Sequence, residues 1–179
     1  MLEDLPEQPE AQSDGPRASL VLAAGAIPGL SGNVWMGGAH SLTGQPMDVS
    51  LLKTAIVIDC AGEMPRQFRA ASLRWVPNVF QDVDAWPMHF DRLEMNVIRA
   101  AEMVRSPVGP IDVYAMCTHG MNRSGLVAGL LLRALGIGGP ESLRLVQAAR
   151  PGALSNETFR RIVESESPDM LLERSLRAQ

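Results

Sequence analysis

One short segment of the chain carries residue types whose spacing could support covalent chemistry. In the run 114–125, YAMCTHGMNRSG, five residues separate Cys117 from Arg123, and Ser124 comes next. An apolar, strand-like run precedes this segment, and a helix-like run, Leu126 to Leu135, follows it. A strand, a tight loop and a helix start in that order bring backbone N–H groups and the positive helix end toward one point. The segment is therefore expected to bind an anion.

The residues of this segment suggest individual roles. Cys117, at a helix N-terminus and near a guanidinium, has the surroundings that favour a nucleophilic thiolate. Arg123 offers a planar fork to two phosphate oxygens, and Ser124 can donate a hydrogen bond to the sulfur. Gly120 permits a turn with positive φ. The other loop residues expected to bind phosphate are Thr118, His119, Met121 and Asn122. For His119, substrate contact and a position in solvent are both left open.

The surrounding sequence predicts the elements that hold this segment. Apolar and β-branched runs predict strands at 33–36, 54–60, 73–76 and 111–116, and a packed strand or lead-in segment at 20–27. Helical spacing of apolar residues predicts helices at 88–105, 125–135 and 140–149, and a last helix capped by Ser155 or Asn156. Early strands, late helices and a crossover helix predict an α/β fold. We expect a central, mostly parallel, twisted sheet of about four to five strands, flanked by helices.

Length and composition favour a single domain. The chain has 179 residues, of which 46% are hydrophobic and 20% charged, enough for one sizeable core. We expect an acidic, proline-rich disordered tail at 1–17, the folded domain at 18–167, and a C-terminal tail or short helix at 168–179. A net charge of -4 and a pI near 5.4 argue against a general binder of nucleic acids or anionic membranes.

The cysteines and the apolar runs bear on the cellular setting. Two cysteines, Cys60 and Cys117, are too few for a disulfide framework and lack the spacing of a zinc site. This favours a reducing, cytoplasmic setting. No run approaches the roughly 20 apolar residues of a membrane span, and the acidic start is unlike a secretory signal. Thiolate, guanidinium and amides supply the nucleophile and the charge stabilisation, so neither metal nor cofactor is expected. The sequence makes no prediction of the oligomeric state.

The run CTHGMNRSG at 117–125 resembles the phosphate loop of the cysteine-dependent protein tyrosine phosphatase superfamily. In size and layout, about 33–163 is similar to the small dual-specificity phosphatases. The resemblance implies that Cys117 attacks phosphorus of a phosphorylated protein or peptide and forms a phosphocysteine, which water then frees. It also implies a general acid on a loop before the crossover helix. Asp82 is the expected acid and Asp84 the alternative, although either carboxylate could instead cap the following helix.

The chain departs from the family pattern at Met116, where a histidine usually supports the loop through hydrogen bonds. We expect a less depressed thiol pKa or compensation by other donors, and slower phosphoenzyme formation. A catalytically weak phospho-binding module, a pseudophosphatase, is an alternative. Thr118-His119-Gly120 with Asn122-Arg123 also resembles the loop of the RNA 5′-triphosphatase domain of mRNA capping enzymes, so an RNA 5′ end is the alternative substrate. Only 4% of the residues are aromatic, which argues against base stacking.

Predictions can also be made for a second cysteine, a late asparagine and two tryptophans. Cys60 ends a strand-like run, and a similar cysteine in the phosphatase and tensin homologue family can pair with the nucleophile. The resemblance suggests Cys60 as a redox partner of Cys117, with an inert buried cysteine as the alternative. Asn156 matches an Asn that dual-specificity phosphatases often place before a late helix, or is a plain helix cap. We expect Trp75 and Trp86 to pack in the core or a loop.

Overall fold

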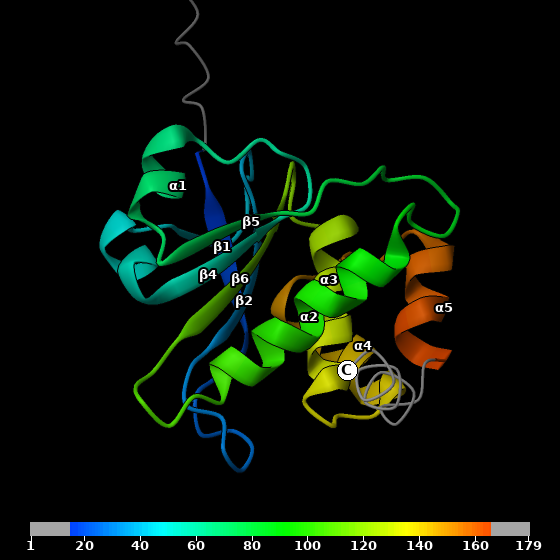
Figure 1. Ribbon diagram of the computed structural model, residues 1–179. Helices are drawn as coiled ribbons and strands as arrows, with labels where there is room; N and C mark the ends of the chain where they lie inside the picture. The colour runs from blue at the N-terminus through cyan, green and yellow to red at the C-terminus, as the bar shows by residue number, and fades with distance from the viewer. Residues whose placement is uncertain (1–14, 166–179) are drawn as a thin grey trace, which may run out of the picture.

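The computed structural model describes residues 15–165 and contains one mixed sheet with helices packed beside it (Figure 1). The sheet has six strands in the order β3-β1-β2-β6-β4-β5. Its strands are β1 (Arg17–Leu22), β2 (Val34–Gly38), β3 (Gln45–Pro46), β4 (Ala55–Asp59), β5 (Arg74–Pro77) and β6 (Asp112–Cys117). Strands β2, β6, β4 and β5 are parallel, whereas β1 pairs antiparallel with both β2 and β3. The predicted α/β fold is confirmed, with one correction: the sheet has six strands. The two-residue β3 is too short and too polar to be predicted.

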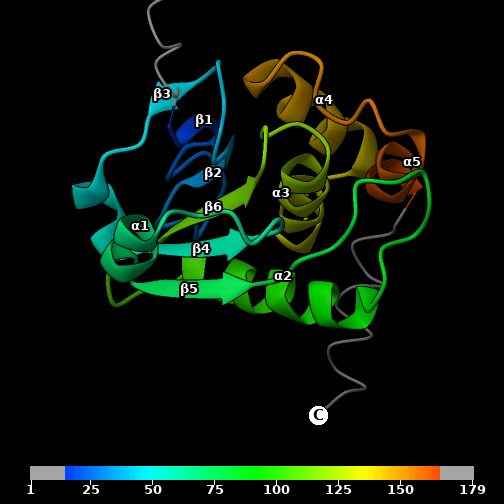
Figure 2. The ribbon, with the colours of Figure 1, turned by 90° about the horizontal axis from the view of Figure 1, so that it is seen from above.

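The helices lie on both faces of the sheet. They are η1 (Val49–Thr54), α1 (Arg66–Ala71), α2 (Phe90–Val104), α3 (Arg123–Ala134), α4 (Gly139–Ala149) and α5 (Glu157–Ser165). Seen from above, α2 to α5 cover one face, and α1 lies at the other (Figure 2). Helix α3 is central, because it contacts α2, α4, α5, β2 and β6. The helix that begins at the anion-binding segment is thus held from several sides.

The predicted elements are all present, with ends shifted by a few residues. The helix expected from residue 125 begins at Arg123, and the one expected from residue 88 begins at Phe90. The short α1 and η1 were not predicted, because neither spans two helical turns of clear apolar periodicity. Of the predicted N-terminal tail, residues 1–14 lie outside the described residues, and Arg17 begins β1. The predicted tail or short helix at 168–179 also lies outside them.

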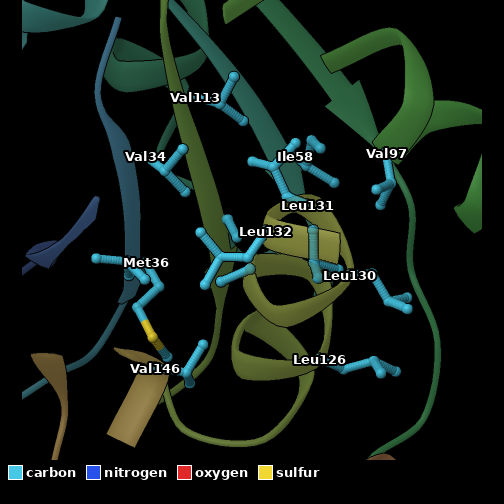
Figure 3. Close-up of a cluster of buried hydrophobic side chains, with 14 of the residues drawn as sticks. Val34, Met36, Ile58, Val97, Val113, Leu126, Leu130, Leu131, Leu132 and Val146 are labelled. Carbon is cyan, nitrogen blue, oxygen red and sulfur yellow. The ribbon is translucent and has the colours of Figure 1, made fainter. Parts of the chain in front are cut away.

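Strand β6 distributes its side chains between two hydrophobic clusters. Because successive residues of a strand point to opposite faces, Val113, Ala115 and Cys117 belong to the cluster on the α3 side. Tyr114 and Met116 belong to the cluster on the other face. Figure 3 shows Val113 with Val34, Ile58 and the leucines of α3 in the first cluster. This alternation directs the side chain of Cys117 toward the start of α3.

No helix within residues 15–165 is long and apolar enough to cross a membrane.

Candidate active site

The loop from Cys117 to Arg123 turns its carbonyl groups outward. The carbonyl of Cys117 accepts from the amide of Ala39 at 2.8 Å, and that of Thr118 from the amide of His40 at 2.9 Å. The carbonyl of Met121 accepts from the amide of Leu154 at 3.3 Å. In a planar trans peptide the C=O and the following N–H point in opposite directions. The amides that follow these carbonyls are therefore directed to the inside of the loop, where they can bind an anion.

The sulfur of Cys117 lies among hydrogen-bond donors. Its Sγ is 3.3 Å from the hydroxyl oxygen of Ser124 and accepts from the amide of Gly120 at 3.2 Å. The residue is only 4% exposed, so access to the sulfur is through the loop itself. The sulfur thus has one backbone N–H donor, from Gly120, and one hydroxyl neighbour, from Ser124. Sulfur, inward amides and the N-terminus of α3 thus meet at one point.

Glycines let the loop lie directly on strand β2. Gly120 has φ of 75°, a conformation that favours glycine. A Cβ on Gly38 would approach the carbonyl carbon of His119 to 2.5 Å, and one on Gly120 would approach that of Gly37 to 2.5 Å. Both distances are shorter than real Cβ contacts. The close packing of β2 against the loop therefore requires glycine on both sides.

Arg123 connects the loop to the segment between β5 and α2, residues 78–89, called here the β5–α2 loop. Its Nη2 donates to the Thr118 hydroxyl at 2.7 Å, and its Nη1 to the carbonyl of Phe80 at 3.3 Å. Its Nε is buried and has no hydrogen-bond partner among the described residues. The guanidinium therefore keeps donor capacity for an anion in the loop.

Asp82 in the β5–α2 loop lies against the phosphate loop. Its carboxylate accepts from the side-chain amide of Asn122 at 3.2 Å and from that of Asn156 at 3.3 Å. Asn156 also donates to the carbonyl of Val83 at 2.9 Å and accepts from the amide of Phe159 at 3.1 Å. Asn156 is thus both a cap of α5 and an anchor of the β5–α2 loop. This double contact could not be inferred from the spacing of the sequence.

Asp84 has different partners. Its carboxylate accepts from the hydroxyl of Thr158 at 2.6 Å and from the amide of Thr158 at 3.0 Å, in the first turn of α5. These hydrogen bonds lower the pKa of Asp84. Asp84 therefore anchors α5, and neither aspartate caps α2, whose N-terminal neighbour His89 makes no side-chain cap.

A polar rim formed by His40, Glu63 and His119 contacts the first half of the loop. Glu63 accepts from the hydroxyl of Thr118 at 3.1 Å and lies 3.7 Å from the His40 Nε2. His119 is exposed, and its Nδ1 lies 3.2 Å from the carbonyl of His40. The three side chains come from three separate segments, so only the fold brings them together.

An apolar cavity of about 350 Å³ lies beside the second half of the loop. Arg123 lines it, together with Phe80, Pro87 and His89. Four exposed apolar side chains of the β5–α2 loop also line it: Val79, Val83, Trp86 and Met88. Trp86 packs edge-on against Phe90 at 4.9 Å between ring centroids and remains 56% exposed. The predicted loop packing of Trp86 therefore leaves part of its ring free for a ligand.

Cys60 and Met116 lie beneath the loop. Cys60 is fully buried in the same cluster as Cys117, and both cysteines are free. Burial, and secondarily the charge of Cys117, raise the pKa of Cys60 well above its usual value. Met116, 1% exposed, packs in the cluster on the opposite face and donates nothing to the loop. Within residues 15–165, no group of three or more acidic, histidine or cysteine side chains is arranged to hold a metal ion.

Arg150 is a residue of the site region that the sequence did not indicate. It follows α4, is 2% exposed, and its Nη2 donates to the carbonyl of His119 at 3.2 Å. The sequence placed it at a helix end, where arginine is usually solvent-exposed.

Comparisons with known proteins identify the fold. No protein-family model and no curated protein sequence match the chain. Human DUSP28 is similar in structure, with a TM-score of 0.59 and 19% identity over 86% of this chain and 96% of that one. TpbA from P. aeruginosa, solved with phosphotyrosine, has a TM-score of 0.56 and 16% identity over 87% and 96% of the two chains.

A third similar structure, PTPMT1 in complex with PI(5)P, has a TM-score of 0.57 and 11% identity over 88% of this chain and 98% of that one. The three proteins share one architecture, although two of them were solved with different phosphorylated ligands. At identities this low, the structural similarity establishes the fold alone. The substrate has to be inferred from the residues of the site. The chain has the dual-specificity phosphatase-like fold of the cysteine-dependent protein tyrosine phosphatases.

Proposed function

We propose that this protein is a phosphoric monoester hydrolase that acts through a phosphocysteine, as a protein tyrosine or dual-specificity phosphatase. The observation that carries the proposal is the surroundings of Cys117. Its sulfur accepts a hydrogen bond from the amide of Gly120 and lies beside the Ser124 hydroxyl, in a loop whose other amides turn inward. Arg123 begins the helix behind it. A nucleophile and a phosphate-binding cradle therefore occupy the same loop.

In the first step, the Cys117 thiolate attacks phosphorus in line with the bond to the leaving oxygen. The S–P bond forms as the P–O bond breaks, and the guanidinium of Arg123 and the inward amides hold the three equatorial oxygens. Asp82 gives its proton to the leaving oxygen, so the alcohol or phenol departs neutral. In the second step, Asp82 takes a proton from water, the water oxygen attacks phosphorus, and the S–P bond breaks. Ser124 donates to the departing thiolate and lowers its basicity.

The hydrogen bonds of the two aspartates support Asp82 as the acid. Asp84 is engaged with the amide and hydroxyl of Thr158, and its lowered pKa makes it a poor proton donor near neutral pH. Asp82 is exposed and lies 3.2 Å from the side chain of Asn122, within the phosphate loop. Of the two aspartates, Asp82 is the one that accepts a hydrogen bond from the phosphate loop, which supports it as the acid.

The apolar cavity supports an aromatic phosphate ester as substrate. Arg123, the proposed phosphate ligand, lines this cavity, so the group esterified to a bound phosphate would extend into it. Trp86 and Met88 offer apolar surface to a phenyl ring. The net charge of -4 and the scarcity of aromatic residues do not favour RNA. The free thiols of Cys60 and Cys117 support a location in a reducing compartment such as the cytoplasm.

The proposal is tested by assaying wild type and Cys117→Ser against four substrates. These are p-nitrophenyl phosphate, a phosphotyrosyl peptide, a phosphoseryl peptide and RNA with a 5′-triphosphate. We expect wild type to hydrolyse the aryl phosphates fastest and Cys117→Ser to lose turnover while still binding the phosphotyrosyl peptide. A rapid acid quench of wild type should capture a phosphorylated protein that Cys117→Ser does not form. Val108→Ala, at an exposed site 94% accessible in the α2–β6 connection, is the matched control.

Two outcomes would contradict the proposal in different ways. Release of γ-phosphate from RNA with little peptide turnover would identify an RNA 5′-triphosphatase. Tight binding of the phosphotyrosyl peptide by wild type without turnover would identify a phospho-binding module.

A further inference from the structure

Arg150 is a buried cation that joins the phosphate loop to two other segments. Its Nη1 donates to the hydroxyl of Ser19 in β1 at 3.1 Å. Its Nη2 donates to the hydroxyl of Ser41, to the carbonyl of Thr43 at 3.2 Å, and to the carbonyl of His119 at 3.2 Å. The guanidinium therefore bonds β1, the β2–β3 connection and the phosphate loop at once.

All of these partners are neutral. None of the ion pairs among the described residues involves Arg150, and its Nε has no hydrogen-bond partner there. Burying a cation without a counter-charge is unfavourable for a fold. Burial lowers the pKa of Arg150, and the one charge that acts to raise it is that of Cys117. A negative charge at Cys117 would therefore act favourably on Arg150.

The contact with His119 also fixes the loop geometry. The carbonyl of His119 and the amide of Gly120 belong to the same peptide unit and point in opposite directions. Arg150 holds the carbonyl outward, and the amide donates to the Cys117 sulfur at 3.2 Å. The outward carbonyls of Cys117 and Thr118 are held by backbone amides instead. Of these contacts, the one from Arg150 is made by a side chain, so a substitution can remove it.

Resting on the proposed function, we propose that Arg150 is a positioning residue of the phosphate site. It holds the His119–Gly120 peptide with its N–H toward the sulfur, and its charge is balanced by the thiolate and by bound phosphate. It thereby supplies support that Met116 cannot give from the opposite face of the sheet. Arg150 is not expected to touch the substrate.

The experiment compares wild type, Arg150→Met, Arg150→Lys and Ser41→Ala, with Arg133→Lys as the control at a second buried arginine. The first readout is the pH dependence of iodoacetamide alkylation of Cys117, measured in Cys60→Ser backgrounds so that one thiol reacts. The second is the dissociation constant of tungstate, a phosphate mimic. Neither readout needs turnover, so both remain informative if the proposed hydrolase activity is absent.

In Arg150→Met we expect the midpoint of alkylation to move up by about one pH unit or more, as for loss of one nearby buried charge. Tungstate should bind on the order of tenfold more weakly, since a charge and a loop contact are both lost. In Arg150→Lys the midpoint of alkylation should stay close to that of wild type, because the positive charge is kept. Tungstate should bind more weakly than to wild type, because an ammonium cannot contact all four hydrogen-bond partners of the guanidinium. Ser41→Ala, which removes one partner of the guanidinium, should give a smaller change of the same sign.

The control Arg133→Lys should leave both readouts unchanged. If Arg150→Met fails to fold, Arg150→Lys and Ser41→Ala decide the question. Variants that lower the melting temperature while keeping the wild-type alkylation midpoint and tungstate affinity would overturn the proposal and leave Arg150 a purely structural residue.

Discussion

The two halves of the phosphate loop meet surroundings of different chemistry. The first half, at Thr118 and His119, contacts the polar rim, in which Glu63 and His40 are exposed and charged or chargeable. The second half, at Asn122 and Arg123, contacts the β5–α2 loop, which adds one carboxylate and a wall of apolar side chains. The comparison suggests a division of work. Under the proposed mechanism, the β5–α2 loop would receive the leaving group and protonate it, whereas the rim would adjust the charge felt by the phosphate.

The largest effect should come from the acid on the β5–α2 loop. Asp82→Asn cannot protonate the leaving oxygen, so kcat for a phosphotyrosyl peptide should fall by about 10²- to 10⁴-fold. KM should change little, and p-nitrophenyl phosphate should be less affected because p-nitrophenolate leaves without a proton. Steady-state kinetics with both substrates measures this. An undiminished kcat for the peptide would show that Asp82 is not the general acid. The proposed division of work between the two halves of the loop would then be wrong.

A smaller effect should come from the apolar wall. Trp86→Ala removes part of the surface that receives an aromatic leaving group, so KM for aryl phosphates should rise on the order of tenfold. Inhibition by inorganic phosphate should not change, because phosphate has no group to place in the cavity. Equal losses for aryl phosphates and for inorganic phosphate would mean that the tryptophan shapes the loop rather than the cavity.

On the rim, Glu63→Gln should act in the opposite direction. Removing a carboxylate near the bound phosphate should lower KM for a phosphorylated peptide by about two- to fivefold, within the range of exposed charge interactions. The change should shrink at high salt, because exposed charges are screened. KM measured at two ionic strengths tests this, and a rise in KM would show that Glu63 instead supports binding through Thr118.

Cys60 lies in the same buried cluster as Cys117 and should affect recovery from oxidation alone. If Cys60 is the redox partner of Cys117, peroxide would convert the Cys117 thiolate to a sulfenic acid, and attack by the Cys60 sulfur would form a disulfide as water leaves. Loss of the Cys117 charge in that step removes one of the causes that raise the pKa of Cys60. Wild type should regain most of its activity in dithiothreitol, and Cys60→Ser clearly less, with equal basal rates. Equal recovery of both proteins would identify Cys60 as an inert core residue.

The smallest effect should come from Asp84, which contacts α5 rather than the phosphate loop. Because its folded-state pKa is lowered, its stabilisation is present above the unfolded-state value of about 3.9 and is lost as the pH falls through the folded-state value. Asp84→Asn should lower the melting temperature slightly at pH 7 and by less at acid pH, where the carboxylate becomes protonated, while kcat stays within about threefold of wild type. A kcat loss as large as that of Asp82→Asn would reverse the assignment of the acid.

The sequence predicted the elements with local periodicity and missed those that depend on distant contacts. The apolar run ending at Cys60 and the continuous apolar helix after Arg123 were evident, because each carries its pattern within a few residues. The polar rim and the role proposed for Arg150 were not evident from the sequence. In both cases the residues in contact come from distant segments that only the folded sheet brings together. Asp82 and Asp84 could not be separated for the same reason: their partners lie in the loop and in α5.

The glycine contact between β2 and the phosphate loop has a consequence for folding. Strand β2 pairs with β6 far along the chain, with Gly38 opposite Cys117, and the loop lies directly on it. Contacts between such distant segments form slowly, because a long stretch of chain must be closed first. The anion cradle should therefore be completed late, after the sheet has assembled. A fragment with only β6, the loop and α3 is expected to leave the cradle unformed and to bind phosphate poorly.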